Sequence, residues 1–310
     1  MTTGVIISDS RPPTSSPHRR SVRRLGVVEA GRFLRSPSMW IGFAVSILLT
    51  ALNFRAGEGK WSGDTYTNAI PVDFLPLLLG VLIAGIRAGG RDQSIDRPGL
   101  AEEAPLDRDD RAVARLAGLI VPVTLGALVV ATVAVASRIA GGFWVGDFPR
   151  RTDTALHSFA EMLQPLLLVA LFGAAGVAAG SRTKRSAPVI VAGTVIWFAA
   201  CMVYWAWQSN GVHVLALLQT QPMPIDLPVG TDPGSLPVDW LAAAPNEFEG
   251  SWQREIVHLP TVWWHNVYLL GLTALCCGLA LGRTLRRSVL PIGLAVAAAG
   301  VVGQVVVSPF

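Results

Sequence analysis

Few ionisable side chains of this 310-residue chain lie within its apolar segments. Glu161 and Gln164 lie about one helical turn apart near the start of one apolar stretch, and Asp73 stands at the start of another. A charge at that depth in a membrane is costly, so it should face protein or water. Glu161 and Gln164 are therefore candidates for lining a translocation path. The alternative is that they sit hydrated at the membrane surface. Asp73 is a weaker candidate for lining the path.

The histidines and cysteines do not suggest a metal site. His258 and His265 are close enough in sequence to share an ion, but no cysteine or carboxylate accompanies them at helical spacing. Cys201, Cys276 and Cys277 all fall in apolar segments, where cysteine behaves as a small hydrophobic residue. We therefore expect neither a disulfide framework nor a cofactor.

The chain also lacks short motifs that carry chemistry. It contains no GxxxxGK[ST] loop for a triphosphate, no GxSxG elbow and no HExxH zinc motif. The glycine-rich run 173–180 lies inside an apolar stretch, where small residues favour close helix packing. We expect no ATP hydrolysis or other enzyme activity in the chain itself. Its basic residues are scattered between apolar runs, which argues against nucleic acid as a partner.

The composition predicts an all-α integral membrane protein. Hydrophobic residues make up 51% of the chain and charged residues 15%, against roughly 25% charged in ordinary soluble domains. A helix needs about 20 residues to cross the hydrocarbon core. Seven stretches are candidates, of which the first two are short: Met39–Phe54, Val72–Ile86, Ala112–Ala136, Phe159–Gly180, Ala187–Trp207, Trp264–Leu281 and Val289–Val307.

The basic residues orient these spans. If all seven cross and the amino terminus is cytoplasmic, 19 of the 25 Lys and Arg residues lie inside, in agreement with the positive-inside rule. Removing the short first span would place the cluster from Arg87 to Arg115 outside, so that span is retained. The prediction is a multi-pass protein of the plasma membrane with a cytoplasmic amino terminus.

The amino-terminal region divides into two parts. Residues 1–20 are predicted to be a disordered basic tail. Residues 21–38 are predicted to form an interfacial amphipathic helix that lies on the inner leaflet and leads into the first span, since Arg alternates with apolar residues until Ser36-Pro37. The alternative is that the basic tail continues to the first span.

Two connections stand out. In the cytoplasmic loop 88–111, Pro98-Gly99 indicates a turn, and Asp107 suits the N-cap of a helix from about Arg108 to Ala136. At 1.5 Å per residue that helix is roughly 43 Å long, so its inner end should project into the cytoplasm. The outer loop 208–262 contains two short apolar stretches, Val212–Leu218 and Leu236–Ala244, which are candidates for re-entrant or interfacial helices.

This order of parts resembles the ABC-2 type transporter permeases. The stretch from Glu29 to Pro37 is similar to the helix that precedes their first span, and the stretch from Glu102 to Leu116 looks like their first cytoplasmic loop. The outer loop 208–262 corresponds to the position of their extracellular re-entrant helices. The resemblance covers about residues 22–285. It implies a six-span bundle over residues 39–287. Residues 288–310 are predicted to form an additional seventh span, which departs from the family's pattern.

The resemblance further implies a function and partners. The chain would be the membrane-spanning subunit of an ATP-driven exporter, form the path as a homo- or heterodimer in the lipid bilayer, and pair with a separate ATPase subunit. By match of position, the element that contacts the ATPase would comprise Leu100, Glu102, Glu103, Leu106, Arg108 and Arg111. If the polar positions of this loop are instead merely solvated, they carry no such role.

The leading alternative is a membrane-embedded enzyme or sensor whose extracytoplasmic loop is the working part. Its candidate site residues are His213, Glu247, Glu249, Glu255 and His258, whose spacing is irregular. A membrane scaffold that only binds partners is a third reading. A P-loop ATPase encoded by the neighbouring reading frame would favour the permease.

Overall fold

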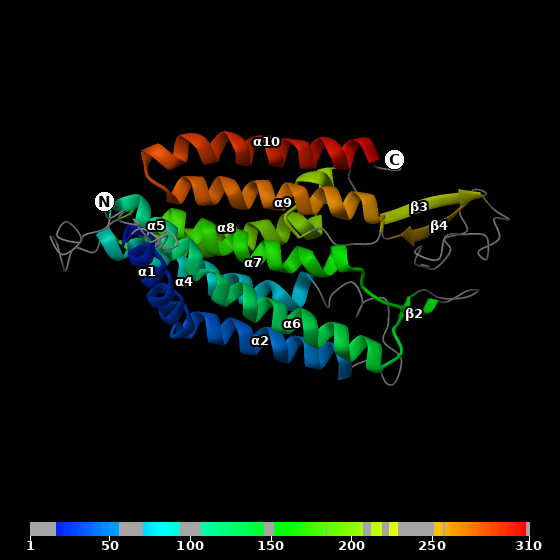
Figure 1. The fold of residues 1–310 in the computed structure, drawn as a ribbon. Helices are drawn as coiled ribbons and strands as arrows, with labels where there is room; N and C mark the ends of the chain where they lie inside the picture. The colour runs from blue at the N-terminus through cyan, green and yellow to red at the C-terminus, as the bar shows by residue number, and fades with distance from the viewer. Residues whose placement is uncertain are drawn as a thin grey trace, which may run out of the picture.

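Long helices lie side by side in this computed structural model and form one elongated bundle (Figure 1). It describes residues 17–55, 71–93, 107–145, 152–183, 185–206, 212–218, 223–228, 251–256 and 258–307. The helices are α1 (Pro17–Leu34), α2 (Pro37–Arg55), α4 (Pro71–Gly89), α5 (Arg108–Gly118), α6 (Ile120–Ile139), α7 (Phe159–Gly180), α8 (Ser186–Ala206), α9 (Leu259–Ala280) and α10 (Arg283–Val307). Two short 3-10 helices, η1 (Gly90–Gln93) and η2 (Val212–Leu215), lie between them.

Six of these helical segments are long and apolar enough to cross a membrane, which confirms the multi-pass character predicted from composition. They are α2, α4, the α5–α6 pair, α7, α9 and α10. In the remaining candidate, α8, a shorter apolar stretch covers Ser186–Ala200, and the helix continues to Ala206. Large apolar side chains are exposed on the outside of the bundle, such as Ile196 on α8 and Val306 on α10. A lipid environment is the setting in which such a surface is stable.

The spans are arranged around α7. Helix α4 packs between α2 and α7, α9 packs on another side of α7, and α10 covers α9 along its length (Figure 1). Helix α8 contacts α4 and α7 over a smaller surface. The main core contains Phe74, Leu77 and Leu168, all buried.

Glycines set the close approach of α4 to α7. A Cβ atom on Gly85 would lie 2.6 Å from the carbonyl oxygen of Gly173, and one on Gly176 would lie 2.5 Å from that of Leu82. Only glycine avoids these overlaps, so the run 173–180 serves the close helix packing predicted for it. The two backbones therefore touch in the half of the bundle nearer the end that is predicted to be cytoplasmic, called the inner end below.

The additional span, α10, belongs to the same bundle. Gly293 of α10 faces α9, and a Cβ there would lie 2.7 Å from the backbone nitrogen of Leu275. Gln304 and Ala297 of α10 are buried against the rest of the bundle. The seventh predicted span is thus a packed part of the structure.

The third predicted span differs from expectation because it is not one continuous helix. Asp107 does cap it, accepting a hydrogen bond from the backbone nitrogen of Asp110 at 2.7 Å. The helix then breaks at Leu119, between α5 and α6. Pro122 accounts for the break, since it has no N–H to donate and its ring crowds the carbonyl of Gly118, four residues earlier. The third span therefore consists of two helical segments joined at Leu119.

The two ends of the bundle differ in structure. Strand β1 (Phe143–Val145) pairs antiparallel with β2 (Thr152–Ala155), and β3 (Met223–Pro228) pairs antiparallel with β4 (Ser251–Ile256). Both pairs lie at the end that the charge distribution assigns to the outside, opposite α1 and α5 (Figure 1). The helical bundle is as expected, whereas strands in these connections were not predicted.

Helix α1 lies at the opposite end, beside α5 (Figure 1). It begins at Pro17, so the last four residues assigned to the basic tail are helical, and it ends at Leu34, just before Ser36-Pro37 as predicted. Phe33 is buried, while Val27 is 68% exposed. Residues 1–16 lie outside the described residues.

Candidate functional site

A buried carboxylate joins α1 to the inner end of α4. Glu29 of α1 is 2% exposed and accepts hydrogen bonds from Arg32 at 2.5 Å and from Arg91 of η1. Burial lowers the pKa of the Arg91 guanidinium, and the Glu29 carboxylate opposes that change. A buried charge needs such partners because its desolvation is costly. The segment that leads from α4 into the loop predicted to be cytoplasmic is therefore held against α1.

Helix α5 is anchored on both of its sides. Against α1, a Cβ on Gly118 would lie 3.2 Å from the backbone nitrogen of Ala30, so the helices pass very close. Towards α10, the Asp109 carboxylate accepts a hydrogen bond from the backbone nitrogen of Gly282, in the turn between α9 and α10. α5 thus links the first and last parts of the bundle at its inner end.

Only part of the predicted ATPase-contacting element can be placed. Leu100, Glu102, Glu103 and Leu106 lie outside the described residues. Arg108 and Arg111 occupy the first turn of α5, beside the turn between α9 and α10 and beside α1. Their contact with an ATPase stays a prediction.

A large apolar cavity lies between α4, α7, α8 and α9. Its volume is about 1120 Å³, and apolar side chains make up most of its wall. Arg185 and Thr183 border it near the start of α8, and Trp197 and Leu272 border it further towards the outer end. The lining favours apolar groups in its interior and one anionic group near Arg185.

Residues 212–218 of the outer loop pack into the bundle at the outer part of this cavity. The carbonyl of Leu215 accepts a hydrogen bond from the Tyr268 hydroxyl at 3.2 Å, and that of Val214 accepts one from the Gln304 amide at 3.2 Å. Leu218 is 2% exposed, and Leu217 lines the cavity. The apolar stretch 212–218 is thus inserted between helices, as a short re-entrant turn would be. The second stretch, 236–244, lies outside the described residues.

Glu161 and Gln164 are both buried at the outer end of α7, but neither lines the apolar cavity. The Glu161 carboxylate accepts a hydrogen bond at 2.7 Å from the backbone nitrogen of Ser158, whose hydroxyl accepts one from the backbone nitrogen of Glu161. This reciprocal capping box stabilises the start of α7. Glu161 therefore has a structural role, and its place in a translocation path stays a prediction.

Other polar groups lie buried near the outer ends of α9 and α10. The amide of Asn266 donates to the carbonyl of Ala160 at 2.8 Å, and His265 shares a hydrogen bond of 3.1 Å with Gln304. Neither Asn266 nor Gln304 was singled out from the sequence. A polar residue inside an apolar stretch is itself the signal that would have found them.

Asp73 also has a partner within the bundle. Its carboxylate is buried at the start of α4 and accepts a hydrogen bond at 2.6 Å from the Asn53 amide of α2. Such a contact joins the two spans near their outer ends. The structure thus gives Asp73 a packing role.

His258 and His265 bind different partners. His258 bonds Thr261 at 2.7 Å, while His265 bonds Gln304. Within the described residues, no group of three His, Cys, Asp or Glu side chains is placed to hold a metal ion. Glu247 and Glu249 of the alternative site lie outside those residues, and His213 and Glu255 lie in η2 and β4.

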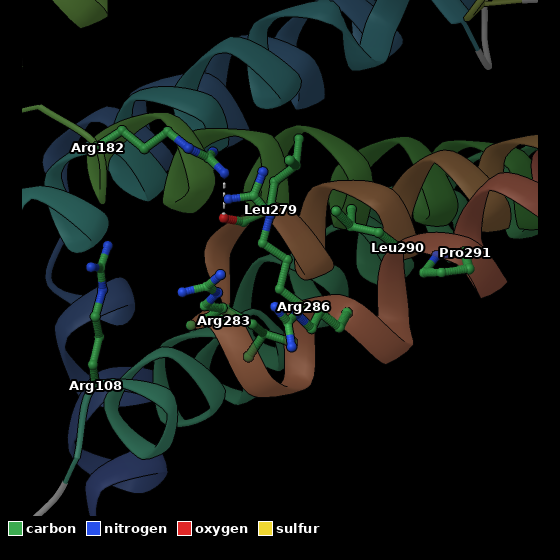
Figure 2. Close-up of a pocket in the computed structure, with 10 residues that line it drawn as sticks. Arg108, Arg182, Leu279, Arg283, Arg286, Leu290 and Pro291 are labelled. Atoms are coloured by element: carbon green, nitrogen blue, oxygen red, sulfur yellow. Dashed lines mark hydrogen bonds between the residues drawn. The ribbon is translucent and has the colours of Figure 1, made fainter.

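A strongly basic pocket opens at the inner end of the bundle. It has a volume of about 670 Å³ and lies among α5, the turn after α7, the end of α9 and the start of α10. Figure 2 shows Arg108 and Arg182 on one side of it and Arg283 and Arg286 facing them. The guanidinium of Arg182 donates to the carbonyl oxygens of Leu279 at 2.7 Å and Ala178 at 3.2 Å.

Comparison of the chain with protein-family models, with curated proteins and with solved structures finds no match. Its assignment to a function therefore rests on the residues and geometry described above.

Proposed function

We propose that this chain is the membrane-spanning permease subunit of an ATP-driven exporter of the ABC-2 type. The apolar cavity among α4, α7, α8 and α9 carries the proposal. Its volume of about 1120 Å³ is at the upper end of small-molecule sites, and it lies within a multi-span bundle. The substrate class that such a lining accommodates is an apolar or amphiphilic molecule.

The inner end of the bundle supports coupling to a separate ATPase subunit. The loop that follows η1 leaves from a segment held to α1 by Glu29 and Arg91. α5, where the chain returns, is bonded to the turn before α10 through Asp109. A groove of about 510 Å³ between α1 and α5 provides further surface at the same end. A partner that moved α5 would therefore displace both sides of the bundle.

The second copy of the permease would pack against α8. Val191 and Val195 of this helix are more than 60% exposed, and α8 contacts the rest of the bundle over a small surface. A second copy, identical or paralogous, would cover this apolar face in a plasma membrane with the amino termini inside. The path would then form between the two copies, next to the cavity.

Site-specific photocrosslinking in the native membrane tests the proposal. A benzophenone amino acid is introduced at Arg108, and a matched control carries it at Leu156, an exposed residue at the outer end. The expected product at Arg108 is an adduct with a P-loop ATPase, identified by mass spectrometry, which is absent from the Leu156 control. Failure to capture or co-purify any ATPase subunit would refute the permease assignment.

A further inference from the structure

The arginines of the basic pocket meet from separate parts of the chain. Arg108 belongs to α5, Arg182 follows α7, and the first turns of α10 add Arg283, Arg286 and Arg287. Within the described residues, no carboxylate lines the pocket and none of these five side chains forms an ion pair. Five like charges repel one another, so a ligand with several negative charges would relieve the repulsion.

Arg182 contacts backbone carbonyls and no acidic side chain within the described residues. Its guanidinium is held by two backbone carbonyls at the ends of α7 and α9, and no acid partners it within the described residues. Burial lowers its pKa, and the neighbouring charges of Arg286 and Arg108 lower it further. Two of its N–H groups donate to these carbonyls and fix the side chain, and the other N–H groups are available to bind an anion.

Apolar residues complete the pocket and indicate where the ligand comes from. Leu279, Leu281, Leu290 and Pro291 line it together with the arginines. Further along α10, the apolar side chains of Ile292 and Leu294 are 62% and 63% exposed. The arginines of α10 therefore stand at the membrane-proximal edge of a lipid-facing helix. Charge beside an open apolar surface fits a headgroup whose acyl chains run along the bundle.

We propose that this pocket binds the headgroup of an anionic phospholipid of the inner leaflet, and that a headgroup with two phosphates, such as that of cardiolipin, fits best. Guanidinium groups bind phosphate oxygens in bidentate fashion, and basic pockets between spans at the cytoplasmic face take such headgroups. The pocket adjoins the apolar cavity, since Leu279 lines both, but headgroup binding there does not depend on the permease assignment. It depends on the cytoplasmic placement of this end of the bundle.

Lipid retention measured by native mass spectrometry tests the proposal. The full chain is reconstituted in nanodiscs of phosphatidylcholine containing cardiolipin, and bound lipid is counted after gentle release into detergent. The double variant Arg283→Gln/Arg286→Gln is compared with Arg35→Gln/Arg87→Gln, which removes two exposed basic residues predicted to lie at the same membrane face but outside the pocket. Size-exclusion chromatography checks that both remain folded.

The expected result is a loss of cardiolipin affinity of about thirtyfold in the pocket variant, with little change in the control. Equal losses in both variants would refute a specific site and leave only general surface attraction. Full displacement by inorganic pyrophosphate at micromolar concentration would assign the pocket to a soluble phosphate ligand instead. Unchanged lipid retention with loss of a co-purifying ATPase would make it a protein-docking surface and overturn the proposal.

Discussion

Replacing Glu29 with Gln should loosen the inner end of the bundle. Glu29 is the buried member of a three-residue network in which the side chains of Arg32 and Arg91 are 48% and 36% exposed. The change keeps the shape of the side chain but removes its charge, so both guanidiniums lose their ionic partner. Because η1 precedes the loop that is predicted to be cytoplasmic, the loss acts on the segment that leads to the predicted ATPase-contacting element.

The two ion pairs should contribute unequally. The pair with Arg32 lies within one helix and is half-exposed. Solvent screening in such a setting limits the contribution of an ion pair to stability to roughly 0.3–0.5 kcal/mol. The pair with Arg91 joins two segments and compensates a buried carboxylate. Removing one partner of a fully buried pair costs about 3–5 kcal/mol, and partial exposure of Arg91 reduces this to about 2 kcal/mol.

Thermal unfolding in detergent provides the measurement. Glu29→Gln should lower Tm by about 5 °C, Arg91→Gln by a similar amount, and Arg32→Gln by about 1 °C. A double-mutant cycle between Glu29 and Arg91 should give a coupling energy above about 1 kcal/mol. Additive effects in that cycle, or equal effects of the two arginine variants, would refute the reasoning.

Further substitutions test other contacts. Gly176→Leu should destabilise the α4–α7 contact by about 3 kcal/mol in the thermal unfolding assay, because even a Cβ would overlap the Leu82 carbonyl. The control is Gly31→Leu, since a Cβ on Gly31 meets nothing within 4 Å. Gln304→Leu removes the bond to Val214 and should speed hydrogen exchange across residues 212–218 about fivefold, with no change at α2. Ser158→Ala should cost about 1 kcal/mol by opening the cap of α7, detectable as faster exchange in its first turn.

The long helices were accessible from sequence because apolar length is a local property. The residues at which these helices begin were harder to predict from sequence. The apolar run placed the sixth span from Trp264, whereas α9 begins at Leu259, and the last span from Val289, whereas α10 begins at Arg283. In α9, the residues that the prediction omitted include Pro260, which the first helical turn tolerates because the N–H that proline lacks would have no partner within the helix. In α10, the additional residues are basic and lie at the predicted membrane surface, so hydropathy alone excludes them.

The break at Leu119 had a sequence signal in Pro122, but the apolar run continues across the break and masked it. The basic pocket had no local signal at all. Arg108, Arg182 and Arg283 are separated by 74 and 101 positions, and in sequence each is one more cytoplasmic arginine that satisfies the positive-inside rule. Only the packing of α5, α7 and α10 shows that they share one pocket.

Helix α5 is where the proposed coupling and the proposed lipid site meet. Arg108 lines the basic pocket, while the adjacent Asp109 bonds the turn before α10. A headgroup in the pocket would contact α5 and α10 together, and it shifts their arrangement only if it binds one arrangement more tightly than another. Linkage then requires the ATPase to change lipid affinity by the same factor by which lipid changes ATPase affinity. Equal ATPase affinity with and without cardiolipin would separate the lipid site from transport while leaving each proposal to its own test.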